Sequence, residues 1–167
     1  MTIITRLLLV EEFGTWALIS GLFVYGMILA PMFSFWATRE TARKINSGKT
    51  SVLAEGLFSV VGMGIYILAV VLVSSQTDVD HNVLIFAVLL IPAMYIHKIL
   101  SSINLGWKPH TVSLSNFSAD LAKIPLVLIF LYYLDMGVVG VIIAFLIGYV
   151  INDITLLWYG REKVKNK

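Results

Sequence analysis

The chain has 167 residues, of which 59% are hydrophobic and only 13% are charged, with a formal net charge of +2 and a mean hydropathy of +0.90. Ordinary soluble domains carry roughly a quarter charged residues, so this composition excludes one and places the chain among membrane proteins. The sequence contains no cysteine, which excludes disulfides and thiolate metal sites.

The apolar residues form five blocks, each long enough for a membrane-spanning helix, which needs about 20 residues to cross ~30 Å of hydrocarbon. The blocks run over residues 15–37, 53–74, 83–104, 114–134 and 138–159. The sequence therefore predicts an all-α integral membrane protein, with a single membrane domain over residues 1–167. Residues 1–14 lack the apolar length and the cleavage pattern of a signal peptide, and they are interpreted as an interfacial helix or as the end of a truncated one.

The loops between the blocks alternate in charge. The cations gather after the first block, after the third block and in the C-terminal tail: Arg39, Arg43, Lys44 and Lys49; Lys108; Arg161, Lys163, Lys165 and Lys167. The loops that begin at Ser75 and Asp135 hold no lysine or arginine. Because these residues favour the cytoplasmic side, the pattern predicts a multi-pass protein of the cell membrane, with its N-terminus outside and its C-terminus in the cytoplasm.

The first block ends in "FWATRETARK", residues 35–44, where Arg39 and Arg43 lie one helical turn apart. Two guanidinium groups at this spacing form a fork suited to phosphate oxygens. The alternative is a stop-transfer cluster that rests on anionic lipid headgroups. The sequence alone leaves both interpretations open.

Five ionisable residues lie inside the later blocks. Glu55, Lys98 and Asp153 lie near the predicted inner ends of their blocks, whereas Lys123 lies about 16 Å from the outer end of its block, with Asp120 three residues away. Charges in hydrocarbon are costly and normally face a bundle interior or a wet cavity. We therefore expect a polar vestibule that opens inward, with Lys123 and Asp120 facing it. For Glu55, Lys98 and Asp153, the alternative is that each side chain snorkels to the inner headgroups.

Proline and small residues mark bends and packing surfaces. Three prolines inside the blocks, which remove backbone donors, predict helix bends: Pro31, Pro92 and Pro125. In the last block, small residues at four-residue spacing predict a stripe on which another helix packs closely: Gly140, Ala144 and Gly148. Asn152 extends this stripe as a candidate for an interhelical hydrogen bond.

Nothing in the sequence indicates catalysis. His81, His97 and His110 are scattered over a loop, a span and another loop, without the paired spacing of a metal site. The segment "TARKINSG" contains the Ala-Arg of a CDP-alcohol phosphotransferase motif, but the aspartates that this chemistry requires are absent around it. We expect no enzyme activity, no cofactor and no metal.

The segment from Arg6 to Arg43 combines a leucine-rich helix end, an acidic pair followed by Phe13 and Gly14, a long apolar helix and an arginine-bearing turn. In this it resembles the Wzx-type oligosaccharide flippases, a polysaccharide-biosynthesis family of the MATE-like MOP superfamily. Family members often carry Gly-Pro where this chain has Leu9-Val10. The later segments "NLGWKPHTVSLSNFSADLAKIPLVLIFL" and "MGVVGVIIAFLIG" are similar to an inner loop with its following helix and to a Gly-x-x-Gly helix start of the family.

The resemblance implies a partial MATE-like flippase bundle that corresponds to helices two to six of the first of two bundles. It implies half or a fragment of a flippase that translocates lipid-diphosphate-linked oligosaccharide across the cell membrane for surface polysaccharide or glycan assembly. The implied partners are membrane lipids, the lipid-linked oligosaccharide and a second membrane bundle of the same or another chain, with no nucleic acid. The alternatives are a non-transporting scaffold or accessory subunit, and a degenerate remnant of such a transporter.

The resemblance also suggests roles for the embedded charges. The candidates for contacting the diphosphate or lining its path are Arg39, Arg43, Lys98 and Lys123. The candidates for balancing these charges or carrying a coupling cation are Glu55, Asp120 and Asp153.

Overall fold

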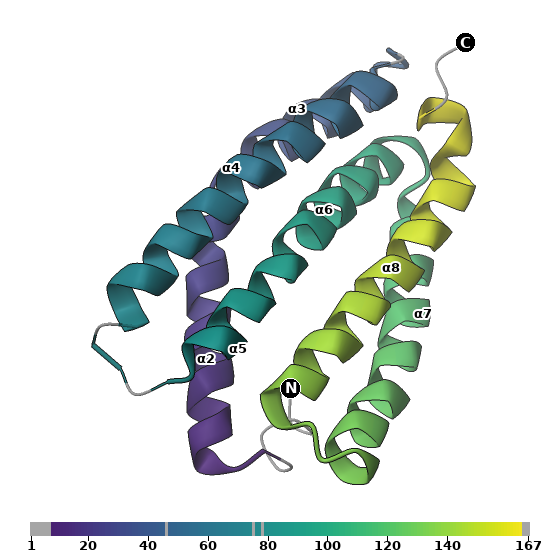
Figure 1. Ribbon diagram of the computed structural model, residues 1–167. Helices are drawn as coiled ribbons and strands as arrows, with labels where there is room; N and C mark the ends of the chain where they lie inside the picture. Colours follow the sequence, from purple (N-terminus) through teal and green to yellow (C-terminus); the bar gives the residue numbers. More distant parts are fainter. Residues whose placement is uncertain (1–7, 46, 75, 78, 165–167) are drawn as a thin grey trace.

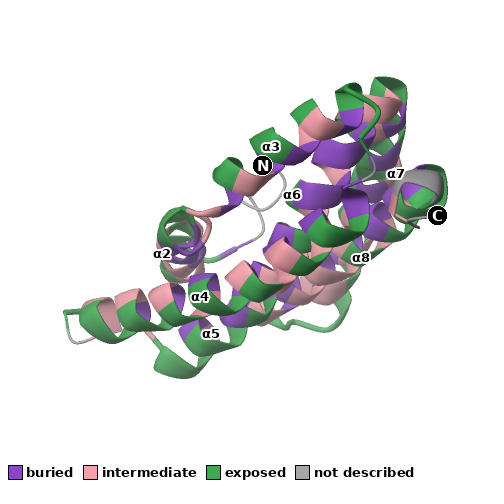
Figure 2. Cartoon of the chain, turned by 90° about the horizontal axis from the view of Figure 1, so that it is seen from above, coloured by how far each residue is buried: buried purple, intermediate pink, exposed green. Residues whose placement is uncertain are grey.

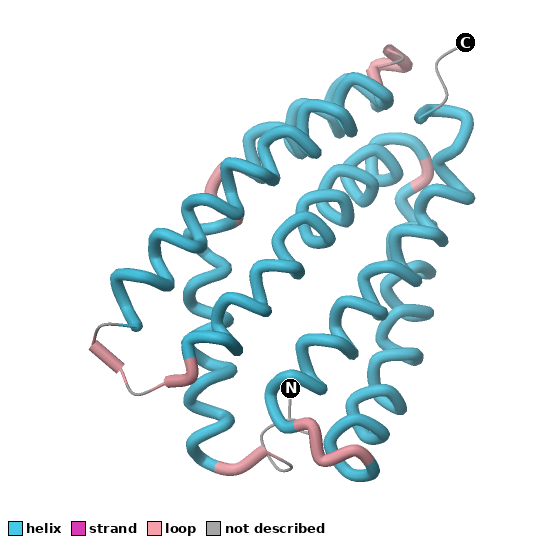
Figure 3. Tube along the Cα trace, in the orientation of Figure 1, coloured by secondary structure: helices cyan, strands magenta, loops and turns pink. Residues whose placement is uncertain are grey.

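The computed structural model describes residues 8–45, 47–74, 76–77 and 79–164, and every regular element in these ranges is helical (Figure 3). The longer helices are α2 (Val10–Gly26), α3 (Ala30–Ala42), α4 (Gly48–Ser74), α6 (Leu90–Trp107), α7 (Pro109–Leu128) and α8 (Gly137–Val164). Short α5 (His81–Phe86) and the 3-10 turn η1 (Ala87–Leu89) lead into α6, and a π-helical segment η2 (Ile129–Tyr133) follows α7. Residues 1–7 of the segment interpreted as an interfacial or truncated helix lie outside the described residues.

Four helical stretches are long and apolar enough to cross a membrane: Gly48–Ser74, His81–Trp107, Pro109–Tyr133 and Gly137–Arg161. Together α2 and α3 meet the same test, so the described residues contain four such helices, or five spans if the bent pair counts as one. Several helices begin before their apolar blocks. α4, for example, begins at Gly48 instead of residue 53. Its first turn contains the exposed polar residues Lys49 and Thr50, so an apolar block does not mark where the helix begins.

The first span differs from the prediction of one helix over residues 15–37. It is broken between Gly26 and Ala30, and the two halves meet at 59°. Pro31 lies in the first turn of α3, where its missing N–H leaves no intrahelical bond unmade. A chain that contains proline at this point therefore ends one helix and starts another at little cost.

The other two prolines also lie beside irregular helix. Pro92 follows η1 by three residues, and Pro125 lies inside α7, four residues before η2. Each proline withholds the hydrogen bond that the carbonyl four residues earlier would accept, so a local change of helix type is the expected accommodation.

In the bundle, α6 lies between two groups of helices (Figure 1). α3 and α4 pack on one side of it, and α8 packs on the other side, with α7 against α8. α2 packs on α4 and reaches α8. The α3–α4 connection, the α6–α7 connection and the C-terminal end of α8 lie at one end of the bundle, and the start of α2, the α4–α5 connection and the α7–α8 turn lie at the other (Figure 1).

Apolar side chains cover the outer faces of the helices as well as most of their contacts, and several polar side chains are buried among the helices. α4 buries Ser51, Glu55 and Ser59 against its neighbours, whereas Leu57 and Leu68 on its outer face are 70% and 65% exposed. Buried residues gather on the faces that the helices turn toward one another (Figure 2). Polar groups at helix contacts and apolar groups outside are the arrangement that hydrocarbon solvent favours.

The small residues of α8 pack on α7, directly or through its π-helical extension. Gly140 lies against Phe130, Ala144 is fully buried, and the aliphatic stem of Lys123 lies across Gly148. One turn further on, the Asn152 side-chain amide donates to the Asn116 Oδ1 at 3.0 Å. This bond between α7 and α8 matches the interhelical bond expected of Asn152.

Candidate functional site

Two adjoining cavities form a groove between α2, α6 and α8. The volume is about 310 Å³ for one cavity and about 250 Å³ for the other. They share Met27, Met94 and Tyr149, so they are two parts of one depression. The remaining lining residues are Trp16, Ser20, Phe23, Val24, Leu90 and Phe145 in the larger cavity and Ala30, Pro31, His97 and Lys98 in the smaller one. We call this depression the α2–α6–α8 groove.

The α2–α6–α8 groove changes character along its length. The larger cavity is lined by aromatic and aliphatic side chains and one serine. The smaller cavity adds His97 and Lys98, about 15 Å from the end of α6 at Trp107. The break between α2 and α3 forms the wall at the junction, since Met27 and Pro31 both line the groove. Apolar side chains therefore line both halves of the groove, and we call the half that also holds His97 and Lys98 the cationic half.

A histidine–aspartate pair joins α6 to α8 beside the cationic half. His97 Nδ1 lies 3.3 Å from Asp153 Oδ1, and the two side chains are only 20% and 12% exposed. The His97 ring centroid lies 5.4 Å from that of Tyr149. The sequence alone does not indicate a role for His97, because the two residues of the pair are 56 positions apart and no local motif joins them.

Lys123 on α7 is not among the lining residues of the groove but lies close to two aromatic rings that line it. Its ammonium lies 5.5 Å from the Phe145 ring centroid and 5.1 Å from that of Tyr149, two rings that line the groove. Its Nζ also lies 3.3 Å from Asp120 Oδ1. A cation over aromatic faces keeps partial compensation for the water it has lost.

The structure corrects the expected placement of Asp120. The Asp120 side chain is 68% exposed, so this chain does not enclose the Lys123–Asp120 pair as predicted. The reason is the packing of α7, which packs mainly on α6 and α8 and leaves much of its surface free in this bundle. The pair lies at the edge of the bundle, with Lys123 turned toward α8.

The other predicted site residues fall into three groups. Lys98 lies in the groove. Glu55 is fully buried and Asp153 is 9% exposed, so neither side chain snorkels to the surface. Arg39 and Arg43 are exposed at the end of α3 and are not among the groove residues. The structure thus separates the arginine fork from the lysines with which it was grouped.

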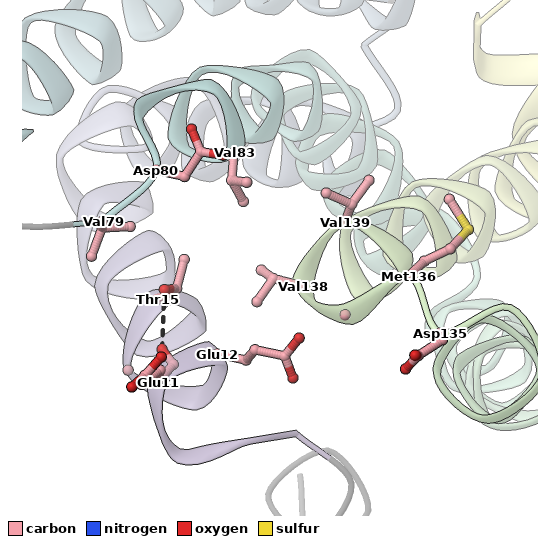
Figure 4. A pocket seen from close by; sticks show the side chains of 12 residues that line it. Glu11, Glu12, Thr15, Val79, Asp80, Val83, Asp135, Met136, Val138 and Val139 are labelled. Atoms are coloured by element: carbon pink, nitrogen blue, oxygen red, sulfur yellow. Dashed lines mark hydrogen bonds between the residues drawn. The ribbon is translucent and has the colours of Figure 1, made fainter.

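A second depression lies at the opposite end of the molecule, between the starts of α2 and α8 and the α4–α5 connection (Figure 4). Its volume is about 790 Å³, and its lining includes Glu11, Glu12, Asp80 and Asp135. No group of three or more His, Cys, Asp or Glu in the described part of the chain is arranged to hold a metal ion.

Glu12 has a structural role in this depression. Its carboxylate accepts the Leu9 N–H at 3.0 Å, which caps the start of α2. It also lies directly against Gly137 at the start of α8, where a Cβ would collide with it and where φ is +52°. Negative charge beside two helix N-termini is favourable, so Glu12 stabilises the contact between α2 and α8.

The helices and the α2–α6–α8 groove together define a class: a multi-pass helical membrane protein with an amphipathic groove at the level of its spans. No protein-family model, curated protein or solved structure matches the chain.

Proposed function

We propose that this chain is one bundle of a flippase-type transporter that moves lipid-diphosphate-linked oligosaccharide across the cell membrane. The observation that carries the proposal is the α2–α6–α8 groove, which is apolar in one half and holds His97 and Lys98 in the other, with the Lys123 ammonium 5.1 Å from the ring centroid of Tyr149, a lining residue. A lipid of this class has the same two parts, a hydrocarbon chain and a diphosphate.

The cations are suited to the diphosphate. Lys98 lines the groove, and no ion pair joins it to an acid within the described residues. Phosphate oxygens bind ammonium groups through charge-assisted hydrogen bonds, which are stronger than neutral ones. Lys98 is exposed on α6, about 14 Å from the helix end at Trp107, so its ammonium is accessible to a phosphate.

The proposed transporter needs a second bundle. In folds with alternating access, one bundle rocks against another around a site near the membrane midplane. Asp120 is largely exposed close to the midplane of α7, and a charge there calls for a protein or water-filled surface beside it. The second bundle is a further copy of this chain or another membrane protein.

Lipid binding tests the proposal. We expect the chain in nanodiscs to bind a polyprenyl diphosphate, and Lys98→Met to weaken this binding about tenfold, since a hydrogen bond to a charged group is worth roughly 1.5–3 kcal/mol. Lys49→Met is the matched control, because Lys49 is exposed at the start of α4 and outside the groove. Equal binding by wild type and Lys98→Met, with loss in Lys49→Met, would instead indicate surface binding and favour a scaffold.

Transport requires a separate measurement. We expect liposomes that contain the chain and its second bundle to flip a fluorescent lipid-linked oligosaccharide, and the lipid to be recovered chemically unchanged. A chain shown to be monomeric should not flip it. Transport by the monomer would contradict the two-bundle proposal.

A further inference from the structure

Glu55 is a buried acid that is not among the residues lining the α2–α6–α8 groove. It lies about 10 Å along α4 from Gly48, within a buried stripe of small and polar residues. Its side chain is 0% exposed. Within the described residues, neither carboxylate oxygen has a hydrogen-bond partner.

The donors nearest to Glu55 on its own helix are already engaged. The Ser51 hydroxyl donates to the Ser47 carbonyl at 2.9 Å, and the Ser59 hydroxyl donates to the Gly56 carbonyl at 2.6 Å. On α6, the Tyr95 hydroxyl donates to the Gly26 carbonyl at 2.8 Å. None of these three hydroxyls therefore compensates a negative charge on Glu55.

The charged groups on the packed helices lie elsewhere or are already paired. α6 brings Lys98, which is exposed and makes no ion pair with Glu55 in the part of the chain that the structure describes. α3 carries Arg39 and Glu40 near its C-terminal end. α2 carries Glu11 and Glu12 in its first turn. α8 brings Asp153, which pairs with His97, and α5 brings exposed His81.

We infer that Glu55 is a proton-binding site, which holds a proton in this arrangement of α4 and α6 and releases it when Lys98 turns toward the carboxylate. An ionised carboxylate without donors in a dry helix contact costs several kcal/mol, so the neutral acid occupies the site. Releasing the proton creates a carboxylate that needs a cation, and α6, which packs on α4, carries Lys98 one turn from Tyr95.

This exchange links the proton to the groove, and the link rests on the proposed function. Lys98 lines the cationic half of the groove when Glu55 is protonated. An anion bound to Lys98 keeps that lysine away from Glu55 and favours the protonated acid. Departure of the anion frees Lys98 for Glu55 and favours release of the proton. Proton uptake and anion binding are then coupled through one lysine.

The test is infrared spectroscopy of the intact chain in nanodiscs in D₂O, where the carbonyl stretch of a protonated carboxylic acid lies above the amide I band. We expect a carboxylic acid band at neutral pH that Glu55→Gln removes and Glu40→Gln retains. Absence of a band that Glu55→Gln removes would overturn the proton site. A band that appears only when sodium is replaced by choline would show that Glu55 binds a metal cation instead.

Lys98→Met tests the link. Without the lysine, the Glu55 band should persist to more alkaline pH than in wild type, and Lys49→Met should leave the titration unchanged. An unchanged titration in Lys98→Met would refute the coupling. Because neither readout uses lipid binding or transport, a failed proposed function leaves both results interpretable, and a failed proton site leaves the groove measurements intact.

Discussion

At the scale of single residues, Lys123 shows how a charge is accommodated deep in the membrane. Its aliphatic stem lies across Gly148, where even a Cβ on that glycine would collide with it. Its ammonium lies over the rings of Phe145 and Tyr149 and beside Asp120. The stem contributes apolar packing and the head contributes charge, so the two roles are separable by mutation.

We predict that Lys123→Met keeps insertion and expression nearly intact and reduces binding of a polyprenyl diphosphate several-fold. Methionine retains an unbranched apolar chain over Gly148 but removes the positive charge beside the two aromatic rings that line the groove. Quantitative binding in nanodiscs measures the effect. Arg161→Met is the control, since Arg161 is exposed near the end of α8 against Trp158.

The double variant separates function from packing. If Lys123→Met prevents folding and adding Asp120→Asn restores it, the pair is structural and the diphosphate site should be sought at Arg39 and Arg43. Full transport by the assembled Lys123→Met protein would remove the functional role of Lys123.

At the scale of helices, α2 and α4 approach closely because two glycines face each other. A Cβ on Gly62 would lie 2.5 Å from the Gly26 carbonyl oxygen and 2.8 Å from the Tyr95 ring. That carbonyl is the one that accepts the Tyr95 hydroxyl. The contact therefore joins three helices, α2, α4 and α6, next to the break in the first span.

We predict that Gly62→Ala lowers the free energy of unfolding by about 1–3 kcal/mol, since a methyl group must push the α2 backbone and Tyr95 aside. Gly64→Ala, two residues along the same helix, meets no atom within 4 Å and should be neutral or slightly stabilising. Thermal unfolding of both variants in the same detergent measures the difference. Equal unfolding midpoints for the two variants would contradict this prediction, because α2 and α4 would then have moved apart at Gly62 without loss of stability.

At the scale of the whole molecule, charge separates the two ends of the bundle. The end that contains the α3–α4 and α6–α7 connections holds Arg43, Lys49 and Lys108 (Figure 1). The opposite end holds the depression lined by Glu11, Glu12, Asp80 and Asp135. Because lysine and arginine prefer the cytoplasmic side, we predict that the first end is the cytoplasmic one.

We predict that single cysteines at Lys49 and Asp80 react with a membrane-impermeant thiol reagent from opposite sides, with Asp80→Cys labelled from outside in whole cells. Both side chains are exposed, whereas neighbouring Ser47 is buried and would report poorly. Arg161→Cys should label from the same side as Lys49→Cys. Labelling of Lys49→Cys and Asp80→Cys from one side would contradict the topology.

The sequence by itself determined that this chain is helical and belongs in a membrane. Hydrophobic length is a local property, and 20 or so apolar residues need no tertiary information to be recognised. Four of the five predicted blocks correspond to helices that qualify as spans. The charges of the loops are likewise a local property that the sequence gives directly. The block over residues 15–37 was the exception, since composition continues smoothly through Met27 while the backbone breaks there.

Only the tertiary structure decided which polar groups meet. An apolar span has similar side chains on all its faces, so its sequence does not fix how the helix is rotated in the bundle. The pairing of His97 with Asp153, the burial of Glu55 without a donor, and the separation of Arg43 from Lys98 all follow from that rotation and from which helices become neighbours. Depth along the membrane can be counted from the sequence, but direction around a helix axis is set by packing, because close contact between small residues selects it.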